Sequence, residues 1–190
     1  MVERTLLHER ATTFKGYRRA DGLFEIEAVL KDTKANPWVS TIHGMMPAEV
    51  PVHHMLIRAA LDDTLEIKEI ELGMPSTPYL ECQGAIPGLQ RLVGRRMSSG
   101  WRKAVDECLG GVTGCTHVRE LLVNMGTAAF QTLAGEHFRE AAAKGERPFA
   151  DLDDPAKFSQ ANRCIAWDLE GTMVRQHFPL IYQKRTDKSP

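Results

Sequence analysis

The sequence predicts an α+β domain in which a three-stranded antiparallel sheet is packed on one face by helices. Apolar residues alternate with polar ones in the first half of the chain, whereas they recur at helical spacing in the second half. Strands followed by helices are typical of an α+β fold rather than of repeated βαβ units. A chain of 190 residues can bury its own core, so we expect one domain over 1–183 and a disordered tail over 184–190.

Three segments carry the strand pattern. The pair Asp21-Gly22 is typical of a two-residue hairpin turn, and the apolar residues that alternate after it are Phe24, Ile26, Ala28 and Leu30. Residues 52–61 and 65–72 predict two further strands, joined by a turn at 62–64. Residues 36–51 contain three prolines and a glycine, so we expect a loop there that lies as a lid over one end of the sheet.

The second half of the chain predicts helices. Residues 89–93 fit a short helix, and residues 101–109 fit another that begins near a cap at Ser98-Ser99 and ends at Gly110-Gly111. Apolar residues at helical spacing over 118–133 predict a long amphipathic helix. The segment 158–178 predicts a last helix, which stops before Pro179 because proline disfavours a helical residue in front of it.

The composition restricts the classes of partner. The 24 basic and 25 acidic side chains give a net charge of -1, which offers no electrostatic attraction for nucleic acid or anionic membranes. No apolar run is long enough to cross a bilayer, and the first residues do not resemble a signal peptide. We therefore expect a cytoplasmic protein with a small-molecule substrate, in which the four cysteines form no structural disulfide.

Cysteines and histidines supply the candidate metal site. His53 opens the second predicted strand and Cys82 follows the third, and an antiparallel hairpin brings these two positions to the same edge of the sheet. Cys115 and His117 fall at the start of the long helix, where the helix dipole favours a thiolate. Two thiolates and two imidazoles suit zinc or iron, and the alternative cofactor is an iron–sulfur cluster.

Other side chains complete this hypothesis. His54 or His43 would move a proton during catalysis, and Arg18 or Arg58 would hold a substrate carboxylate. Adjacent strand residues point to opposite faces, so at most one of the two neighbouring histidines is a metal ligand. Two alternatives stay open: Cys115 acts as a nucleophile without a metal, or the cysteines are only buried apolar residues.

Three segments resemble a bacterial family known only as domain of unknown function 2889. They are Gly16-Tyr-Arg-Arg-Ala-Asp-Gly-Leu, Val52-His-His-Met-Leu-Ile-Arg and Leu109-Gly-Gly-Val-Thr-Gly-Cys-Thr-His-Val-Arg-Glu-Leu. The resemblance extends from Thr5 to Gln131 and implies no established activity, although it suggests a context of bacterial aromatic-compound catabolism. The family pattern has aspartate after the first histidine, where this chain has His54, and this favours His53 as the functional residue.

The order of elements is also similar to that of iron–sulfur scaffold proteins of the Isc and Suf type. In these proteins one cysteine follows the third strand and another opens a late helix, and the similarity implies that His53, Cys82 and Cys115 share a pocket. The chain departs from the scaffolds because their first cysteine is absent and because His117 follows Cys115. The departures favour a recruited metal site over cluster transfer.

Together these observations predict a metal-dependent enzyme of lyase or hydrolase type that acts on a small molecule, aromatic compounds being the favoured class. The alternative is a non-catalytic scaffold that receives an iron–sulfur cluster, or a sulfur acceptor. The amphipathic face of residues 118–133 also allows a homodimer, although such a face more often packs on the core of its own chain.

Overall fold

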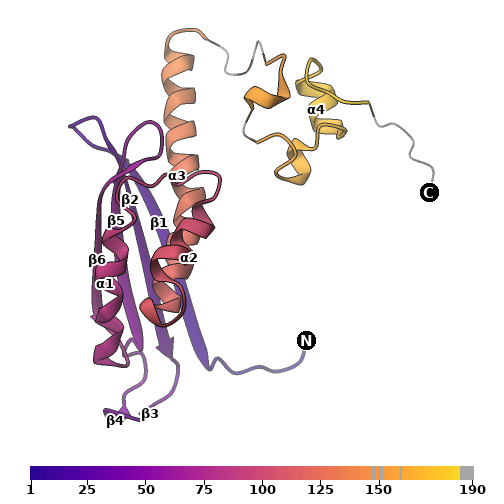
Figure 1. Cartoon of the computed structure of the whole chain (residues 1–190). Helices are drawn as coiled ribbons and strands as arrows, with labels where there is room; N and C mark the ends of the chain where they lie inside the picture. Colours follow the sequence, from indigo (N-terminus) through magenta and orange to yellow (C-terminus); the bar gives the residue numbers. More distant parts are fainter. Residues whose placement is uncertain (147–148, 150–151, 159, 185–190) are drawn as a thin grey trace. The chain divides into compact units, whose positions relative to one another are not determined.

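The computed structural model describes residues 1–146, 149, 152–158 and 160–184, and it divides the chain into two compact units (Figure 1). The first unit is Met1–His137 and the second is Phe138–Pro190. A single domain over 1–183 stays a prediction. Residues 185–190 of the predicted tail lie outside the described residues.

The first unit is built on a four-stranded antiparallel sheet in the order β1-β2-β5-β6. Its strands are β1 at His8–Arg18, β2 at Phe24–Lys34, β5 at His53–Leu61 and β6 at Ile67–Ser76. The α+β class is confirmed, but the prediction of three strands is wrong because β1 also belongs to the sheet. Nearly every residue of this edge strand is exposed and only Phe14 is partly buried, so its sequence shows no alternation.

The first hairpin forms where the sequence predicts it, but its turn is longer than the predicted two residues, because the hydrogen bond from Arg19 N–H to the Leu23 carbonyl oxygen leaves residues 20–22 between them. Gly22 has φ of 89°, a left-handed conformation that glycine adopts without steric cost, and Arg18 pairs with Phe24 on either side of the turn. The four alternating apolar side chains of β2 are at most 1% exposed. The same register pairs Arg10 of β1 with Asp32 of β2, and Asp32 with His53 of β5.

The segment predicted as a loop over 36–51 contains a second, two-stranded sheet, and that prediction is wrong in this detail. Its strands are β3 at Trp38–Ser40 and β4 at Gly44–Met46. Strands of three residues are too short to show a period in the sequence. The Ser40 hydroxyl accepts hydrogen bonds from the backbone N–H groups of Ile42 and His43, which fixes the turn between the strands.

Helices pack on the core face of the large sheet (Figure 1). They are the 3-10 helix η1 at Leu80–Ala85, α1 at Ile86–Gln90, α2 at Trp101–Leu109, the 3-10 helix η2 at Gly111–Thr113 and α3 at Thr116–Ala143. The predicted helices over 101–109 and 118–133 are confirmed. The short helix predicted over 89–93 forms earlier in the chain, at 86–90, and residues 91–93 are a turn. The residue before α2 is Gly100, without a side-chain cap, so the predicted serine cap is wrong. None of the described helices is both long and apolar enough to span a bilayer.

Close approaches position α3. Gly126 lies against the indole ring of Trp101, and the indole Nε1 donates a hydrogen bond to the carbonyl oxygen of Leu122 at 2.6 Å. Gly16 of β1 lies against the side chain of Thr132 so closely that a β-carbon would overlap it. These contacts hold α3 against α2 and β1, and they set where its first turn meets the end of the sheet.

The second unit has little regular structure. After the end of α3 it contains the 3-10 helices η3 at Pro155–Lys157 and η4 at Ile165–Trp167, and the short helix α4 at Thr172–His177. The predicted helix over 158–178 is therefore wrong. Asn162 has φ of 54°, and its side-chain oxygen accepts a hydrogen bond from Leu169, which folds this segment into a compact turn.

Candidate metal centre

The polar centre of the first unit is Asp32, which occupies a core-facing position near the end of β2. Asp32 follows Leu30 at the next alternate position of β2, so its carboxylate occupies a place where a further apolar side chain would be expected. The residue is only 2% exposed. Burial raises the pKa of this carboxyl group, but the Arg10 guanidinium and His53 outweigh that effect and hold the pKa at about 2. Asp32 is therefore ionised at neutral pH.

Arg10 and His8, on the neighbouring strand β1, hold this carboxylate. Arg10 Nε donates to Oδ1 of Asp32 at 2.7 Å, and Nη2 donates to Oδ2 at 2.8 Å. Arg10 Nη1 also donates to Oε2 of Glu120 on α3 at 2.9 Å, and His8 Nε2 lies 3.2 Å from Oδ1 of Asp32. Both carboxylate oxygens are thus engaged within the protein, and the network ties β1, β2 and α3 together.

His53 lies directly opposite Asp32 in the β2–β5 register. Its Nδ1 is 2.9 Å from Oδ2 of Asp32, and because that carboxylate is ionised, Nδ1 carries the proton and donates it. Burial lowers the pKa of His53 and outweighs the opposing influence of Asp32, so the ring is neutral at pH 7. The lone pair of Nε2 is consequently the basic, ligand-forming position of His53.

His117, on the first turn of α3, lies against the ring of His53. The ring centroids are 3.8 Å apart with an angle of 35° between the planes, and His117 Nε2 is 3.9 Å from Oδ2 of Asp32. One ligand-capable atom from each of Asp32, His53 and His117 lies within 4.8 Å of the others. Two imidazoles from a strand and a helix therefore converge beside one carboxylate.

Cys115 immediately precedes α3 and faces His117. Its Sγ is 3.8 Å from His117 Nδ1. Burial raises the pKa of the Cys115 thiol, but His117 and the backbone N–H groups of Val118 and His117 outweigh it, and the net pKa is lowered. The start of the helix therefore favours the thiolate, in the direction that the sequence predicts.

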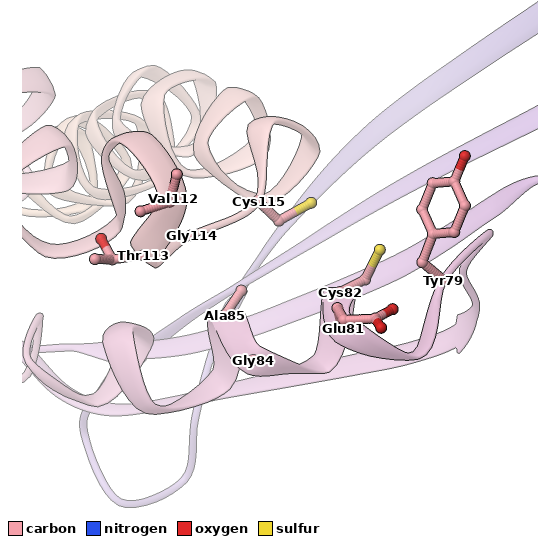
Figure 2. Close-up of a pocket in the computed structure, with 9 residues that line it drawn as sticks. All are labelled: Tyr79, Glu81, Cys82, Gly84, Ala85, Val112, Thr113, Gly114 and Cys115. Atoms are coloured by element: carbon pink, nitrogen blue, oxygen red, sulfur yellow. The ribbon is translucent and has the colours of Figure 1, made fainter.

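A cavity of roughly 490 Å³ adjoins Cys115 (Figure 2). One wall comes from η1 and the residue before it, the other from η2 and the residues before α3, and Cys82 and Cys115 face the cavity from opposite walls. The remaining lining residues are Tyr79, Glu81, Gly84, Ala85, Val112, Thr113 and Gly114. Of the four predicted ligands, the structure thus brings His53 and His117 together beside Asp32. Cys115 contacts His117 from the cavity side, and Cys82 lies across the cavity.

Two of the other predicted site residues lie on the opposite face of the sheet. The odd-numbered residues of β5, such as His53 and Met55, face the core, so the even-numbered His54 and Arg58 face away from it. The Arg58 guanidinium instead lies 3.5 Å from the carboxylate of Glu71. The structure does not bring His54 or Arg58 to the cluster around Asp32.

Arg18 and His43 are also placed elsewhere. Arg18 stands eight residues along β1 from Arg10, a distance of roughly 26 Å in an extended strand, and its guanidinium covers the ring of Phe24 at 4.4 Å. His43 is exposed in the turn between β3 and β4, where its backbone N–H donates a hydrogen bond to the Ser40 hydroxyl. Neither side chain is brought to the cluster around Asp32.

Sequence reasoning missed Asp32, Arg10 and His8. The sequence does contain a signal for Asp32. It follows Leu30 at the next alternate position, so it is expected on the same core-facing side of the strand as Phe24 and Leu30. A charged residue in core register must be paired or functional. Arg10 and His8 could be found only after β1 was recognised as a strand.

Comparison with protein families gives a match over most of the first unit. The family described as protein of unknown function (DUF2889) matches residues 8–131, well over half of the chain. The chain belongs to the DUF2889 family. No curated protein and no solved structure matches it. The DUF2889 match extends over Asp32, His53, Cys115 and His117, and also over Arg10 and His8 of β1, whereas residues 138–190 lie beyond it.

Proposed function

We propose that this protein is a metal-dependent enzyme of hydrolase or lyase type that acts on a small molecule, aromatic compounds being the class to test first. The metal is zinc or iron, held by His53, His117 and Cys115. Neutral imidazoles and a thiolate are the ligands that zinc and ferrous iron accept in proteins.

One observation carries this proposal: the buried carboxylate of Asp32 accepts the Nδ1 proton of His53 and leaves its Nε2 beside His117. A carboxylate that orients a histidine in this way is the usual support of a metal-bound imidazole. His53 is also neutral at pH 7, so a metal ion need not displace a proton from it.

Asp32 is better suited to support the site than to bind the metal directly. Its two oxygens already accept hydrogen bonds from Arg10 and His53, and the positive charge of Arg10 balances its own. A dication bound to His53, His117 and the Cys115 thiolate would then leave a site charge near +1. That residual charge would attract an electron-rich substrate group without a second acidic ligand.

The bound metal would supply Lewis-acid chemistry, polarising a carbonyl group or lowering the pKa of water. The protein would contribute position and access. The hydrogen bond from His53 to Asp32 fixes one ring, the start of α3 fixes His117 and Cys115, and the cavity beside Cys115 gives room for a substrate.

Metal analysis of purified protein, together with four variants, tests the proposal. His53→Ala, His117→Ala and Cys115→Ala each remove one proposed ligand, and His54→Ala is the matched control on the opposite face of the same strand. We expect about one equivalent of zinc or iron in the wild type and in the control, and a loss of more than tenfold in affinity in the other three. Absence of metal in the wild type, or equal loss in His53→Ala and His54→Ala, would overturn the proposal.

A second function is favoured by the thiols of Cys82 and Cys115, which face one cavity from opposite walls. Thiolates are the ligands of iron–sulfur clusters, so the chain could serve as a scaffold that receives a cluster. The same analysis distinguishes the two functions when the protein is purified without oxygen. Iron accompanied by an equal amount of sulfide supports the scaffold, whereas zinc, or iron without sulfide, supports the enzyme.

A further inference from the structure

The cavity beside Cys115 has an unusual charge pattern for a site that is expected to bind an acid. Glu81 brings the one carboxylate found among the described lining residues, and none of those residues is basic. Figure 2 shows Tyr79, Glu81 and Cys82 together on the η1 wall. Arg18 and Arg58, the side chains expected to hold a carboxylate, are placed far along β1 and on the opposite face of the sheet.

The opposite wall does not supply an alternative anion site. A helix N-terminus ordinarily attracts anions through its unpaired backbone N–H groups. At the start of α3, the N–H groups of His117 and Val118 are already directed at Cys115 Sγ. The remaining lining side chains on this wall are Val112 and Thr113, which offer an apolar surface and a hydroxyl group.

Tyr79 adds the other recognition element. Its side chain is half exposed at the cavity, so one face of the phenol ring is available to a ligand. An aromatic face attracts both other rings and cations, and a carboxylate on the same wall strengthens the attraction for a cation. The volume of roughly 490 Å³ is typical of a pocket for a small organic molecule.

We infer that this cavity selects small amines, with the ammonium group beside Glu81 and an apolar or aromatic body against Tyr79 and Val112, and that it discriminates against carboxylates and phosphates. The inference rests on the proposed function, because it names the substrate class of the same site. It replaces the expectation that an arginine holds a substrate carboxylate.

Protection of cysteines from alkylation measures occupancy of the cavity directly. The full-length protein is freed of metal with chelator and treated with iodoacetamide at constant pH in the presence of benzylamine, benzyl alcohol or benzoate. The modification of Cys82 and Cys115 is then measured by mass spectrometry of their peptides. Cys164, which is exposed and lies outside the cavity, reports any general effect of the probe on the reagent.

We expect benzylamine to protect Cys82 and Cys115 at a concentration about fivefold lower than benzoate, the ratio that about 1 kcal/mol of charge interaction gives. Glu81→Gln should abolish this preference. Glu107→Gln is the matched control, because Glu107 is an exposed residue of α2 that pairs with Lys103, and it should keep the preference.

Equal or better protection by benzoate, no protection by any probe, or an unchanged preference in Glu81→Gln would overturn the inference. The test needs no bound metal, so its failure is distinguishable from failure of the proposed function. Wild-type protein that contains no metal when purified, and that still prefers benzylamine in this assay, would refute the metal-dependent enzyme and leave the amine site standing.

Discussion

The packing of Gly126 against Trp101 allows a test of how α3 is positioned. A β-carbon at Gly126 would lie 2.7 Å from Cδ1 of the indole ring, whereas a β-carbon at Gly135 of the same helix would meet nothing within 4 Å. The indole cannot swing aside cheaply, because Trp101 is 6% exposed and its Nε1 is hydrogen-bonded to Leu122. Alanine substitution at each of the two glycines therefore distinguishes the effect of helix propensity from the effect of steric overlap with Trp101.

The expected magnitudes follow from these two surroundings. Replacing a helical glycine by alanine stabilises a helix by about 1 kcal/mol, so Gly135→Ala should raise the free energy of unfolding by about that amount. Gly126→Ala gains the same term but loses about 1–3 kcal/mol to overpacking. We therefore expect Gly126→Ala to be less stable than Gly135→Ala by about 1–3 kcal/mol.

Urea unfolding of both variants and the wild type, followed by far-UV circular dichroism, measures this difference. Tryptophan fluorescence of the folded state provides a second readout, since only Gly126→Ala should disturb the surroundings of Trp101. Equal stabilisation by the two substitutions, with unchanged fluorescence, would refute the close contact between α2 and α3.

Three further outcomes are expected. In metal-free protein Asp32→Asn should lower the free energy of unfolding by roughly 2 kcal/mol at pH 7, because the folded-state pKa of Asp32 is about 2 against an ordinary value of 3.8. A carboxyl pKa that is lower in the folded state stabilises the protein at pH values above the unfolded-state pKa. The difference in free energy of unfolding between wild type and variant should therefore become smaller as the pH falls from 4 toward 2. An equal difference in urea titrations at pH 7 and pH 3 would contradict this. His117→Ala should raise the pKa of the Cys115 thiol and move the pH profile of its alkylation to higher pH, whereas an unmoved profile would remove His117 as the cause. Leu122→Ala, at a fully buried position, should cost about 2–5 kcal/mol by thermal or urea unfolding, and Leu80→Ala, at an 85% exposed one, should cost less than about 0.5 kcal/mol.

The parts of the fold that the sequence predicted are those in which one face is buried and the other exposed. Phe24 to Leu30 alternate because alternate residues of β2 enter the core, and residues 118–133 repeat at helical spacing because one side of α3 packs on the sheet. The strand β1 has no such contrast, since its side chains are exposed on both faces. The apolar residues of 158–178 contact one another in a turn, and their spacing matched a helix by coincidence.

The candidate site was predicted in part for the same reason. Strand order and hairpin geometry placed His53 at an edge of the sheet, and the helix start placed Cys115 beside His117. The contact between His53 and His117 depends on how α3 docks, which is fixed by Gly16, Gly126 and the side chains that they meet. The hydrophobic periodicity of a sequence does not indicate where one element docks on another. The sequence therefore could not show which of the predicted ligands lie in contact.

The distribution of the candidate site along the chain would couple metal binding to the folding of the whole first unit. The proposed ligands come from β5 and the start of α3, and Asp32, which orients His53, comes from β2. These residues span positions 32 to 117, so no short fragment of the chain contains them all. A metal ion that binds this arrangement and not the unfolded chain stabilises the native state by about 2.7 kcal/mol at a concentration 100 times its Kd. The metal would then retard amide hydrogen exchange in two strands and a long helix simultaneously, so that metal supply would set the lifetime of the folded protein against proteolysis.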